Sequence, residues 1–194
     1  MFKIAALVSG GGTNLQAIID ANIENVCIDL VVSTNGQAFA LERAKKAGID
    51  SLVVEKSSFA DAKAREAVLL EEFTRRNIDL IVLCGCLMVL SEEFIEDFGK
   101  PIINVHPSLL PAYGGRGFYG TAVHEAVLEA KDAVTGATVH YVDGGIDTGR
   151  IILQKEVNVE PNDTVETLQR RVMEQAEWKI LPEVIARFVK GELP

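Results

Sequence analysis

The chain has 194 residues, of which 48% are hydrophobic and 24% are charged, so we expect a globular protein with a full core rather than a disordered chain. Its formal net charge is -9 and its Lys and Arg residues are scattered, which disfavours binding to duplex nucleic acid. No apolar run approaches the roughly 20 residues that a membrane-spanning helix needs. An anionic ligand would have to be held by local geometry, because the overall charge repels it.

Short apolar runs alternate with amphipathic runs through the first half of the chain. Strands are predicted at residues 4–8, 27–33, 51–55, 79–85 and 101–106. Helices are predicted between them at residues 15–21, 38–48, 60–76 and 91–98. Continuous apolar strands separated by amphipathic helices are typical of a parallel sheet that is covered on both faces.

The second half of the chain has a different pattern. A glycine-rich loop is followed by a helix, a pair of strands and a long helix for which Asp163 is the predicted N-cap. The ranges predicted for these elements are 112–120, 121–131, 135–143, 150–159 and 164–189. We therefore predict a Rossmann-like α/β fold: a mainly parallel twisted sheet with helices on both faces, a C-terminal antiparallel strand and a long final helix. Residues 1–194 are interpreted as one domain.

Three cysteines, Cys27, Cys84 and Cys86, lie in apolar runs and form no zinc-type pair of CxxC motifs. Reduced, buried thiols and a cytoplasmic location are expected from this pattern. The N-terminal apolar run is interpreted as the first strand, since it lacks the length and cleavage site of a signal peptide.

The segment SGGGTNL, residues 9–15, follows the first predicted strand and opens the first predicted helix. Glycines let a backbone approach a ligand closely, and a helix N-terminus offers free N–H groups to an anion. The segment lacks the GK[ST] of a P-loop, and Leu15 breaks the GxGxxG pattern of dinucleotide sites. It favours a phosphate monoester. The alternative is a tight turn in which Thr13 is the N-cap of the helix.

Asn104 and His106 alternate at the end of an apolar strand, directly before Pro107. Side chains two residues apart on a strand share a face, and ligands of open α/β sheets bind at the carboxyl ends of the strands. An amide donor beside an imidazole suits acid–base or oxyanion chemistry. Alternatively, Asn104 caps backbone groups and His106 is an interior residue with its hydrogen bonds satisfied.

Two carboxylates, Asp143 and Asp147, flank a glycine pair in the turn between the last two predicted strands. Asp143 is interpreted as a turn former. Asp147 is either a second turn former or, with His140, part of the site around Asn104. Neither the GxSxG of a serine nucleophile nor the HExxH of a zinc site occurs, and no metal is expected.

Together these segments resemble the folate-dependent glycinamide ribonucleotide formyltransferases. The similarity covers nearly the whole chain and rests on SGGGTNLQAII, NVHPSLLPAY, TGATVHYVDGGIDTGRIILQ and EWKILP. The resemblance implies transfer of a formyl group from the co-substrate 10-formyltetrahydrofolate to the amino group of glycinamide ribonucleotide, in purine biosynthesis. It also implies a phosphate-binding half at about residues 1–100 and a folate-binding, catalytic half at about residues 101–194.

By the same resemblance, the catalytic residues are Asn104, His106 and Asp147. Asn104 would donate a side-chain N–H to the oxyanion formed when the amine adds to the formyl carbon. A protonated His106 would be the second donor, kept charged by Asp147, which would also help to relay a proton. His140 would be an accessory group.

The resemblance also implies the substrate contacts. The phosphate would bind the backbone of Gly12, Thr13 and Asn14, and Glu177 would bind ribose hydroxyls. The folate pocket would be formed by Leu87, Met88, Val89, Leu90, Asn104, Val142 and Asp143. Lys63 or Arg65 would meet the glutamate tail of the folate.

The chain departs from the family pattern in two places. Some relatives carry a basic residue near the phosphate where this chain has Glu174, and segment 163–177 is one residue longer than in some relatives. Arg170, on the same helical face, is the candidate replacement.

The second departure is the loop at residues 112–120, which brings Arg116, Phe118 and Tyr119 to the lid of the site. His124, just beyond this loop, is expected on a helix surface.

The alternative function is a formyltetrahydrofolate hydrolase, which has the same Asn-His-Asp site but uses water as the acceptor. Hydrolases are expected to carry an extra N-terminal domain and to lack the glycine-rich loop. Formylation of methionyl-tRNA is disfavoured by the charge of -9, and no nucleic-acid or membrane partner is expected. We expect a monomer or a homodimer.

Overall fold

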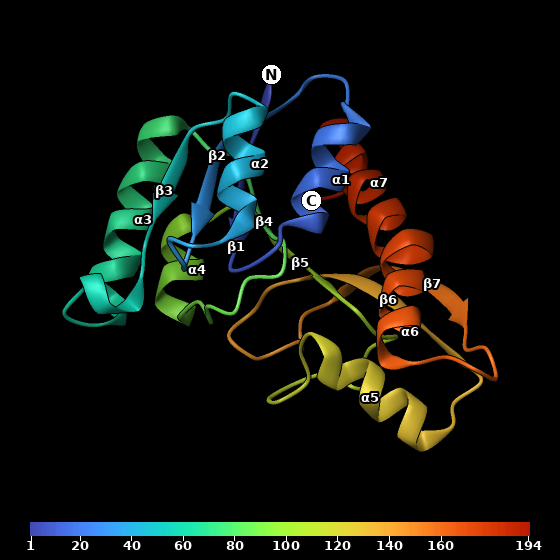
Figure 1. The fold of residues 1–194 in the computed structure, drawn as a ribbon. Helices are drawn as coiled ribbons and strands as arrows, with labels where there is room; N and C mark the ends of the chain where they lie inside the picture. The colour runs from blue at the N-terminus through green and yellow to red at the C-terminus, as the bar shows by residue number, and fades with distance from the viewer.

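The computed structural model describes all 194 residues. Its centre is a seven-stranded sheet in the order β3-β2-β1-β4-β5-β6-β7 (Figure 1). Strands β1 to β5 pair in parallel, whereas β6 is antiparallel to both of its neighbours. The strands are β1 (Phe2–Val8), β2 (Val26–Ser33), β3 (Ser51–Val53), β4 (Leu80–Leu83), β5 (Ile102–His106), β6 (Val134–Tyr141) and β7 (Ile151–Asn158).

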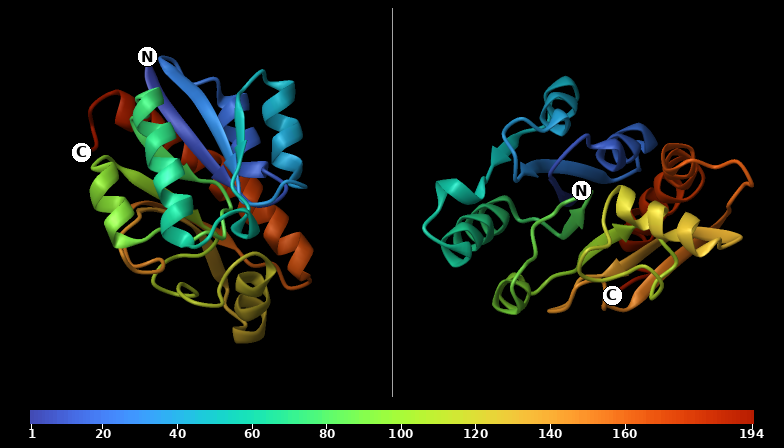
Figure 2. Two further views of the ribbon diagram at one scale, coloured as in Figure 1. Left: turned by 90° about the vertical axis from the view of Figure 1, so that its left-hand side faces the viewer. Right: turned by 60° about the horizontal axis from the view of Figure 1, so that its bottom comes forward.

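Helices cover both faces of the sheet. The helical elements are α1 (Thr13–Ala21), α2 (Phe39–Lys46), η1 (Lys56–Ser58), α3 (Ala62–Arg76), α4 (Glu92–Phe98), α5 (Thr121–Ala130), α6 (Val165–Val172), η2 (Met173–Glu177) and α7 (Trp178–Val189). Helices α3 and α4 pack on one face, and the left-hand view of Figure 2 shows them side by side in front of the sheet. The other face is covered by α1, α2, α5, α6 and α7.

The central strand β1 explains why both faces need helices. Ile4, Ala6 and Val8 pack into the core on one face, while Ala5 and Leu7 pack into the core on the other. All five are fully buried. A strand that is apolar on both sides is typical of a parallel sheet between two helical layers, so the predicted fold class is confirmed.

The predicted elements are present, and most of their ends differ from the prediction by one or two residues. The long final helix is the exception: it divides into α6, the π-helical turn η2 and α7. The predicted capping by Asp163 is wrong. Thr164 is the N-cap, and its hydroxyl accepts the N–H of Thr167. Asp163 instead pairs with the guanidinium of Arg171, which lowers the pKa of the carboxyl to about 2.

The strand order creates the place for a ligand. From β1 the chain runs outward to β2 and β3, and it then returns to add β4 and β5 on the other side of β1. The loops that leave β1 and β4 therefore diverge to opposite faces of the sheet and leave a crevice between them, as expected at a topological switch point. No helix in the structure is long and apolar enough to span a membrane.

Gly136 sits where β6 and β7 approach each other too closely for a side chain. A Cβ atom at this position would lie 2.1 Å from the carbonyl oxygen of Lys155 and 2.7 Å from a methyl group of Leu109. By contrast, a Cβ atom at Gly11 would meet nothing within 4 Å.

We predict that Gly136→Ala lowers the free energy of unfolding by about 1–3 kcal/mol, because β7 must move away from β6. Thermal unfolding followed by circular dichroism measures the effect, with Gly11→Ala as the matched control that keeps the wild-type midpoint. Equal midpoints for Gly136→Ala and the wild type would show that the strand pair has room for a methyl group.

Candidate active site

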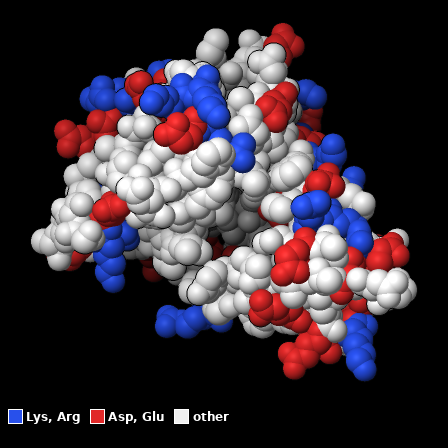
Figure 3. Space-filling model, in the orientation of Figure 1, with Lys and Arg blue, Asp and Glu red and all other residues white.

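A cavity of about 750 Å³ opens at the carboxyl ends of β1, β4 and β5. Its walls come from the loops after these three strands, from loop 142–147, from loop 115–120 with α5, and from α6 with η2. The space-filling view is hollowed near its centre, between the part that carries α1 and α2 and the part that carries α5 (Figure 3). Most atoms around this hollow belong to uncharged residues, whereas the charged side chains lie mainly toward the outside (Figure 3).

The end of β5 carries the first two candidate catalytic residues. Asn104 and His106 both line the cavity, as their alternation on the strand predicts. Antiparallel pairing of β5 with β6 sets His140 directly opposite Asn104 and Thr138 opposite His106. Cross-strand neighbours on one face are close enough to bond, and here Asn104 Nδ2 lies 3.1 Å from His140 Nε2.

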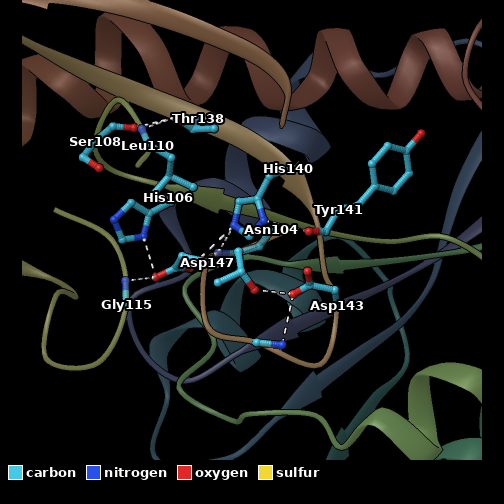
Figure 4. Close-up of polar contacts among 12 residues, drawn as sticks. Asn104, His106, Ser108, Leu110, Gly115, Thr138, His140, Tyr141, Asp143 and Asp147 are labelled. Atoms are coloured by element: carbon cyan, nitrogen blue, oxygen red, sulfur yellow. Dashed lines mark hydrogen bonds and ion pairs between the residues drawn. The ribbon is translucent and has the colours of Figure 1, made fainter. Parts of the chain in front are cut away.

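Asp147 completes the cluster from the loop after β6 (Figure 4). One oxygen, Oδ2, accepts the N–H of Gly115 at 3.0 Å and lies 3.5 Å from His106 Nδ1. The other oxygen, Oδ1, lies 3.4 Å from Asn104 Nδ2 and 3.6 Å from His140 Nε2. Asp147 has a left-handed backbone (φ 58°), a conformation that Asp tolerates better than most residues. The structure therefore brings together the four polar side chains that the sequence singled out here.

The surroundings of Asp147 keep it charged. Burial alone would raise its pKa, but the contacts with His140, the N–H of Gly115 and His106 outweigh it and hold the pKa below the ordinary value of 3.8. A carboxylate among these groups accepts hydrogen bonds and attracts a proton on either imidazole.

His106 is subject to two opposing effects. Its Nε2 lies 2.7 Å from the carbonyl oxygen of Tyr113, so this nitrogen carries a proton and donates it. Only 4% of His106 is exposed, and burial lowers its pKa below 6.5 despite the opposing attraction of Asp147. Its Nδ1 faces Asp147 Oδ2 at 3.5 Å, where the carboxylate would stabilise a proton on this nitrogen.

His140 orients Asn104. Its Nδ1 lies 2.8 Å from the carbonyl oxygen of Tyr141, so Nδ1 donates and Nε2 accepts from the Asn104 amide. The second N–H of Asn104 has only the longer contact to Asp147, at 3.4 Å. This N–H is therefore the one that can most readily donate a hydrogen bond to an oxygen atom of a ligand.

A hydrogen-bonded support fixes the loop that follows β5. The hydroxyl of Thr138 donates to the carbonyl of Ser108 at 2.6 Å and accepts the N–H of Leu110 at 3.0 Å. Gln154 donates to the same hydroxyl and to the carbonyl of Leu110. Thr138 is fully buried, so these bonds hold the loop from beneath.

The glycine-rich segment after β1 is open to the cavity. Cβ atoms added at Gly10 or Gly11 would meet nothing within 4 Å, so space for a ligand remains beside this backbone. Gly12 is closed on its outer side, where a Cβ would lie 2.6 Å from Ala40. Gly12, with φ 69°, occupies the N-cap position and Thr13 is the first residue of α1, so the alternative role of Thr13 as the cap is wrong.

Asn14 and Glu177 form a buried pair beside this segment. Asn14 Nδ2 donates to Glu177 Oε2 at 2.7 Å, and both residues line the cavity. Burial raises the pKa of Glu177 to about 7, against the lowering effect of this hydrogen bond. Asn14 Oδ1 is buried without any partner, although buried acceptors are normally satisfied. The pair thus leaves an acceptor free for a hydroxyl group of a ligand.

The predicted folate residues line the opposite part of the cavity. Met88 and Leu90 are buried, whereas Leu87 and Val89 are 65% and 60% exposed. The backbone groups of Val89 and Leu90 make no hydrogen bond within the chain and remain available to a polar ring edge. Asp143 has a structural role as well, since its Oδ1 accepts from Gly145 N and from the hydroxyl of Thr148.

The two basic residues predicted for the folate tail do not line the cavity. Lys63 pairs with Glu93 at 2.7 Å on the surface. Arg65 is half-buried, and its charge acts on Cys86, which does line the cavity. Arg65 is therefore the better placed of the two. No group of three or more His, Cys, Asp or Glu side chains is arranged to hold a metal ion.

His124 does not lie on the surface, as the sequence analysis expected. It is 1% exposed, it lines the cavity, and neither of its ring nitrogens has a partner. Burial lowers its pKa to about 4. The available signal was its position beside Val123 and Val127 on the buried side of α5.

Other wall residues had no clear sequence signal. The carbonyl of Tyr113 and the N–H of Gly115 contact His106 and Asp147 through the backbone, which a side-chain pattern does not reveal. Gln169 and Met173 reach the cavity from α6 and η2.

Known proteins share the sequence and the fold of this chain. A family model described as formyl transferase matches residues 2–185. A phosphoribosylglycinamide formyltransferase of Haemophilus influenzae is 39% identical over 100% of this chain and 90% of its own length. The trifunctional purine biosynthetic protein adenosine-3 of Drosophila melanogaster is 38% identical over 97% of this chain, which spans only 14% of that much longer protein.

Solved structures match at the same level. The glycinamide ribonucleotide transformylase 1 of Symbiobacterium toebii superimposes with a TM-score of 0.91 at 39% identity, covering 100% of this chain and 90% of that one. The phosphoribosylglycinamide formyltransferase of Coxiella burnetii superimposes with a TM-score of 0.89 at 36% identity, covering 98% of this chain and 88% of that one. The family model and these full-length matches establish that the chain belongs to the formyl transferase family.

Proposed function

We propose that the protein transfers the formyl group of 10-formyltetrahydrofolate to the amino group of glycinamide ribonucleotide, a step of purine biosynthesis. The observation that carries the proposal is the convergence of Asn104, His106 and Asp147 on one wall of a cavity that also contains the glycine-rich segment. The names of the full-length relatives support the same reaction. A volume of about 750 Å³ lies within the usual range of ligand-binding cavities.

The reaction passes through an oxyanion that the site must stabilise. The substrate amine adds to the formyl carbon, a C–N bond forms, and the carbonyl electron pair moves to oxygen. Asn104 is placed to donate to this oxygen with the N–H that now makes only the long contact to Asp147. Removing one such donor typically raises a barrier by about 3 kcal/mol.

The second problem is a proton, which must leave the amine nitrogen and arrive at the departing N10. Burial favours the neutral form of His106, and in that form Nδ1 can accept a proton as the amine becomes cationic. The resulting imidazolium is stabilised by Asp147 at 3.5 Å. It can then stabilise the oxyanion and supply N10 as the C–N10 bond breaks and the carbonyl re-forms. Asp147 acts here by setting the proton affinity of His106.

In this proposal the protein is a single domain. Its N-terminal half binds the phosphate of the ribonucleotide, and its C-terminal half contributes to folate binding and catalysis. The N–H groups of Gly12, Thr13 and Asn14 take the phosphate at the positive end of α1. The Asn14–Glu177 pair takes the ribose hydroxyls, which supply the donor that Asn14 Oδ1 lacks.

The folate binds along residues 87–90 and 142–143, where apolar side chains and unpaired backbone groups fit a flat polar ring. A cytoplasmic location and the absence of nucleic-acid and membrane partners remain part of the proposal. So does a reaction without a metal.

The alternative is hydrolysis of formyltetrahydrofolate at the same three residues, with water as the acceptor. The open glycine-rich segment and the unpartnered Asn14 favour an acceptor that carries phosphate and hydroxyl groups. An absorbance assay for deformylated folate, run with and without glycinamide ribonucleotide, separates the two. We expect turnover only with the ribonucleotide, and equal rates in its absence would identify a hydrolase.

Asp147→Asn tests the proton chemistry. Asparagine can still accept the N–H of Gly115, so the loop is retained, but the negative charge beside His106 is lost. We expect kcat to fall at least roughly 100-fold while the unfolding midpoint stays within a few degrees. Asp97→Asn on the exposed side of α4 is the control and should keep the wild-type rate. A wild-type kcat in Asp147→Asn would eliminate Asp147 from the mechanism.

Glu177→Gln tests the burial of the carboxyl. A folded-state pKa of about 7, raised from 4.5, means that the folded protein holds this proton more tightly than the unfolded chain does. The stabilisation of the fold by the protonated Glu177 is therefore complete below pH 4.5 and is lost as the pH rises toward 7. Glutamine mimics the protonated acid, so the variant should melt a few degrees above the wild type at pH 8 and close to it at pH 5. The same difference at both pH values would show that Glu177 titrates normally.

A further inference from the structure

The cavity has an unusual balance of charge for a site that takes a phosphate. Three carboxylates line it, those of Asp143, Asp147 and Glu177, but only one cationic side chain, that of Arg116. A phosphate monoester carries between one and two negative charges near pH 7. Backbone N–H groups at α1 contribute partial charges alone, so most of the opposing charge within the cavity must come from Arg116.

Arg116 is exposed and lines the cavity, so its side chain is free to bind a ligand. Its guanidinium makes no hydrogen bond and no ion pair within the chain, in contrast to those of Arg43 and Arg171. It lies between Gly115 and Gly117, whose φ values of 89° and 96° suit glycine, in a loop that forms one wall of the cavity. The N–H of Gly115 binds Asp147, so the loop is fixed to the catalytic cluster one residue before Arg116.

The other basic residues near the phosphate segment are less suitable. Arg43 reaches this segment from outside: it donates to the carbonyl of Gly11 and to Gln16, and it does not line the cavity. Arg170 is exposed on α6 and does not line the cavity either. The next turn offers Glu174, which is exposed and has the wrong charge.

Two buried side chains with unpartnered polar atoms show that this region of the cavity is built for a polar ligand. Asn14, in the first turn of α1, leaves Oδ1 without a partner, and His124, in the helix that directly follows the Arg116 loop, leaves both ring nitrogens without one. Both side chains are more than nine-tenths buried and line the cavity. A ligand that spans from α1 to α5 would satisfy them and would lie within the walls that Arg116 shares.

We propose that Arg116, in the loop at residues 115–120, binds the substrate phosphate and completes the site that begins at the N-terminus of α1. The inference rests on the proposed function, since it assumes a phosphorylated acceptor. Arginine binds phosphate through two parallel N–H donors, and such charge-assisted pairs are among the strongest hydrogen bonds in proteins. The loop thereby links recognition of the phosphate to the position of Asp147.

Steady-state kinetics of Arg116→Ala tests the assignment. We expect KM for glycinamide ribonucleotide to rise roughly 10- to 100-fold, with KM for 10-formyltetrahydrofolate within about twofold of wild type. Arg116→Lys keeps the charge but loses the paired N–H donors of arginine. Its KM for glycinamide ribonucleotide should therefore lie between those of the wild type and Arg116→Ala. Arg75→Ala, at an exposed position of α3 outside the cavity, is the matched control and should keep both KM values. A rise in KM for the folate instead, or a phosphate defect in Arg170→Ala but not in Arg116→Ala, would overturn the proposal.

Binding of ribose 5-phosphate, measured by calorimetry, gives a readout that needs no turnover. Wild-type protein should bind it and Arg116→Ala should bind it roughly 10-fold or more weakly, whereas unphosphorylated ribose should not distinguish them. If the wild type turns over the ribonucleotide while Arg116→Ala matches it in KM and in ribose 5-phosphate binding, the inference fails and the proposed function stands. If the wild type binds ribose 5-phosphate through Arg116 but does not formylate the ribonucleotide, the proposed function fails instead.

Discussion

The site depends on one buried carboxylate. Asp147 contacts His106, His140, Asn104 and the backbone of Gly115, which belong to β5, β6 and the lid loop. Without it, no carboxylate would lie beside the two imidazoles to favour a proton on His106. Because both oxygens of Asp147 are engaged, the four groups hold one another in place, and their geometry exists before any substrate arrives.

The sheet explains why these groups meet. Parallel strands bring the glycine-rich segment, residues 87–90 and Asn104 to one edge, because each follows the carboxyl end of a strand. The reversal of direction at β6 then adds His140 from the opposite direction, directly across from Asn104. The loop that follows β6 then carries Asp147 back to the same cluster.

Much of this was predictable from the sequence, for physical reasons. Continuous apolar runs between amphipathic segments predicted the strands, and the alternation of Asn104 and His106 predicted their shared face. The lowered pKa of His106 was not predictable, because it depends on burial, which is a product of the fold. The burial of His124 was missed because helix periodicity gives a direction but not the depth of the neighbouring wall.

The π-helical turn η2 shows how the final helix keeps a consistent buried face. In an unbroken α-helix of about 100° per residue, Val172 and Val184 would point about 120° apart. If one of the twelve intervening steps adds no rotation, the angle between the two side chains falls to about 20°. Both side chains are fully buried in the same core. The wide turn absorbs that step. Glu177 ends the turn and faces the cavity beside Asn14, so the irregular geometry coincides with a binding residue, as π turns often do.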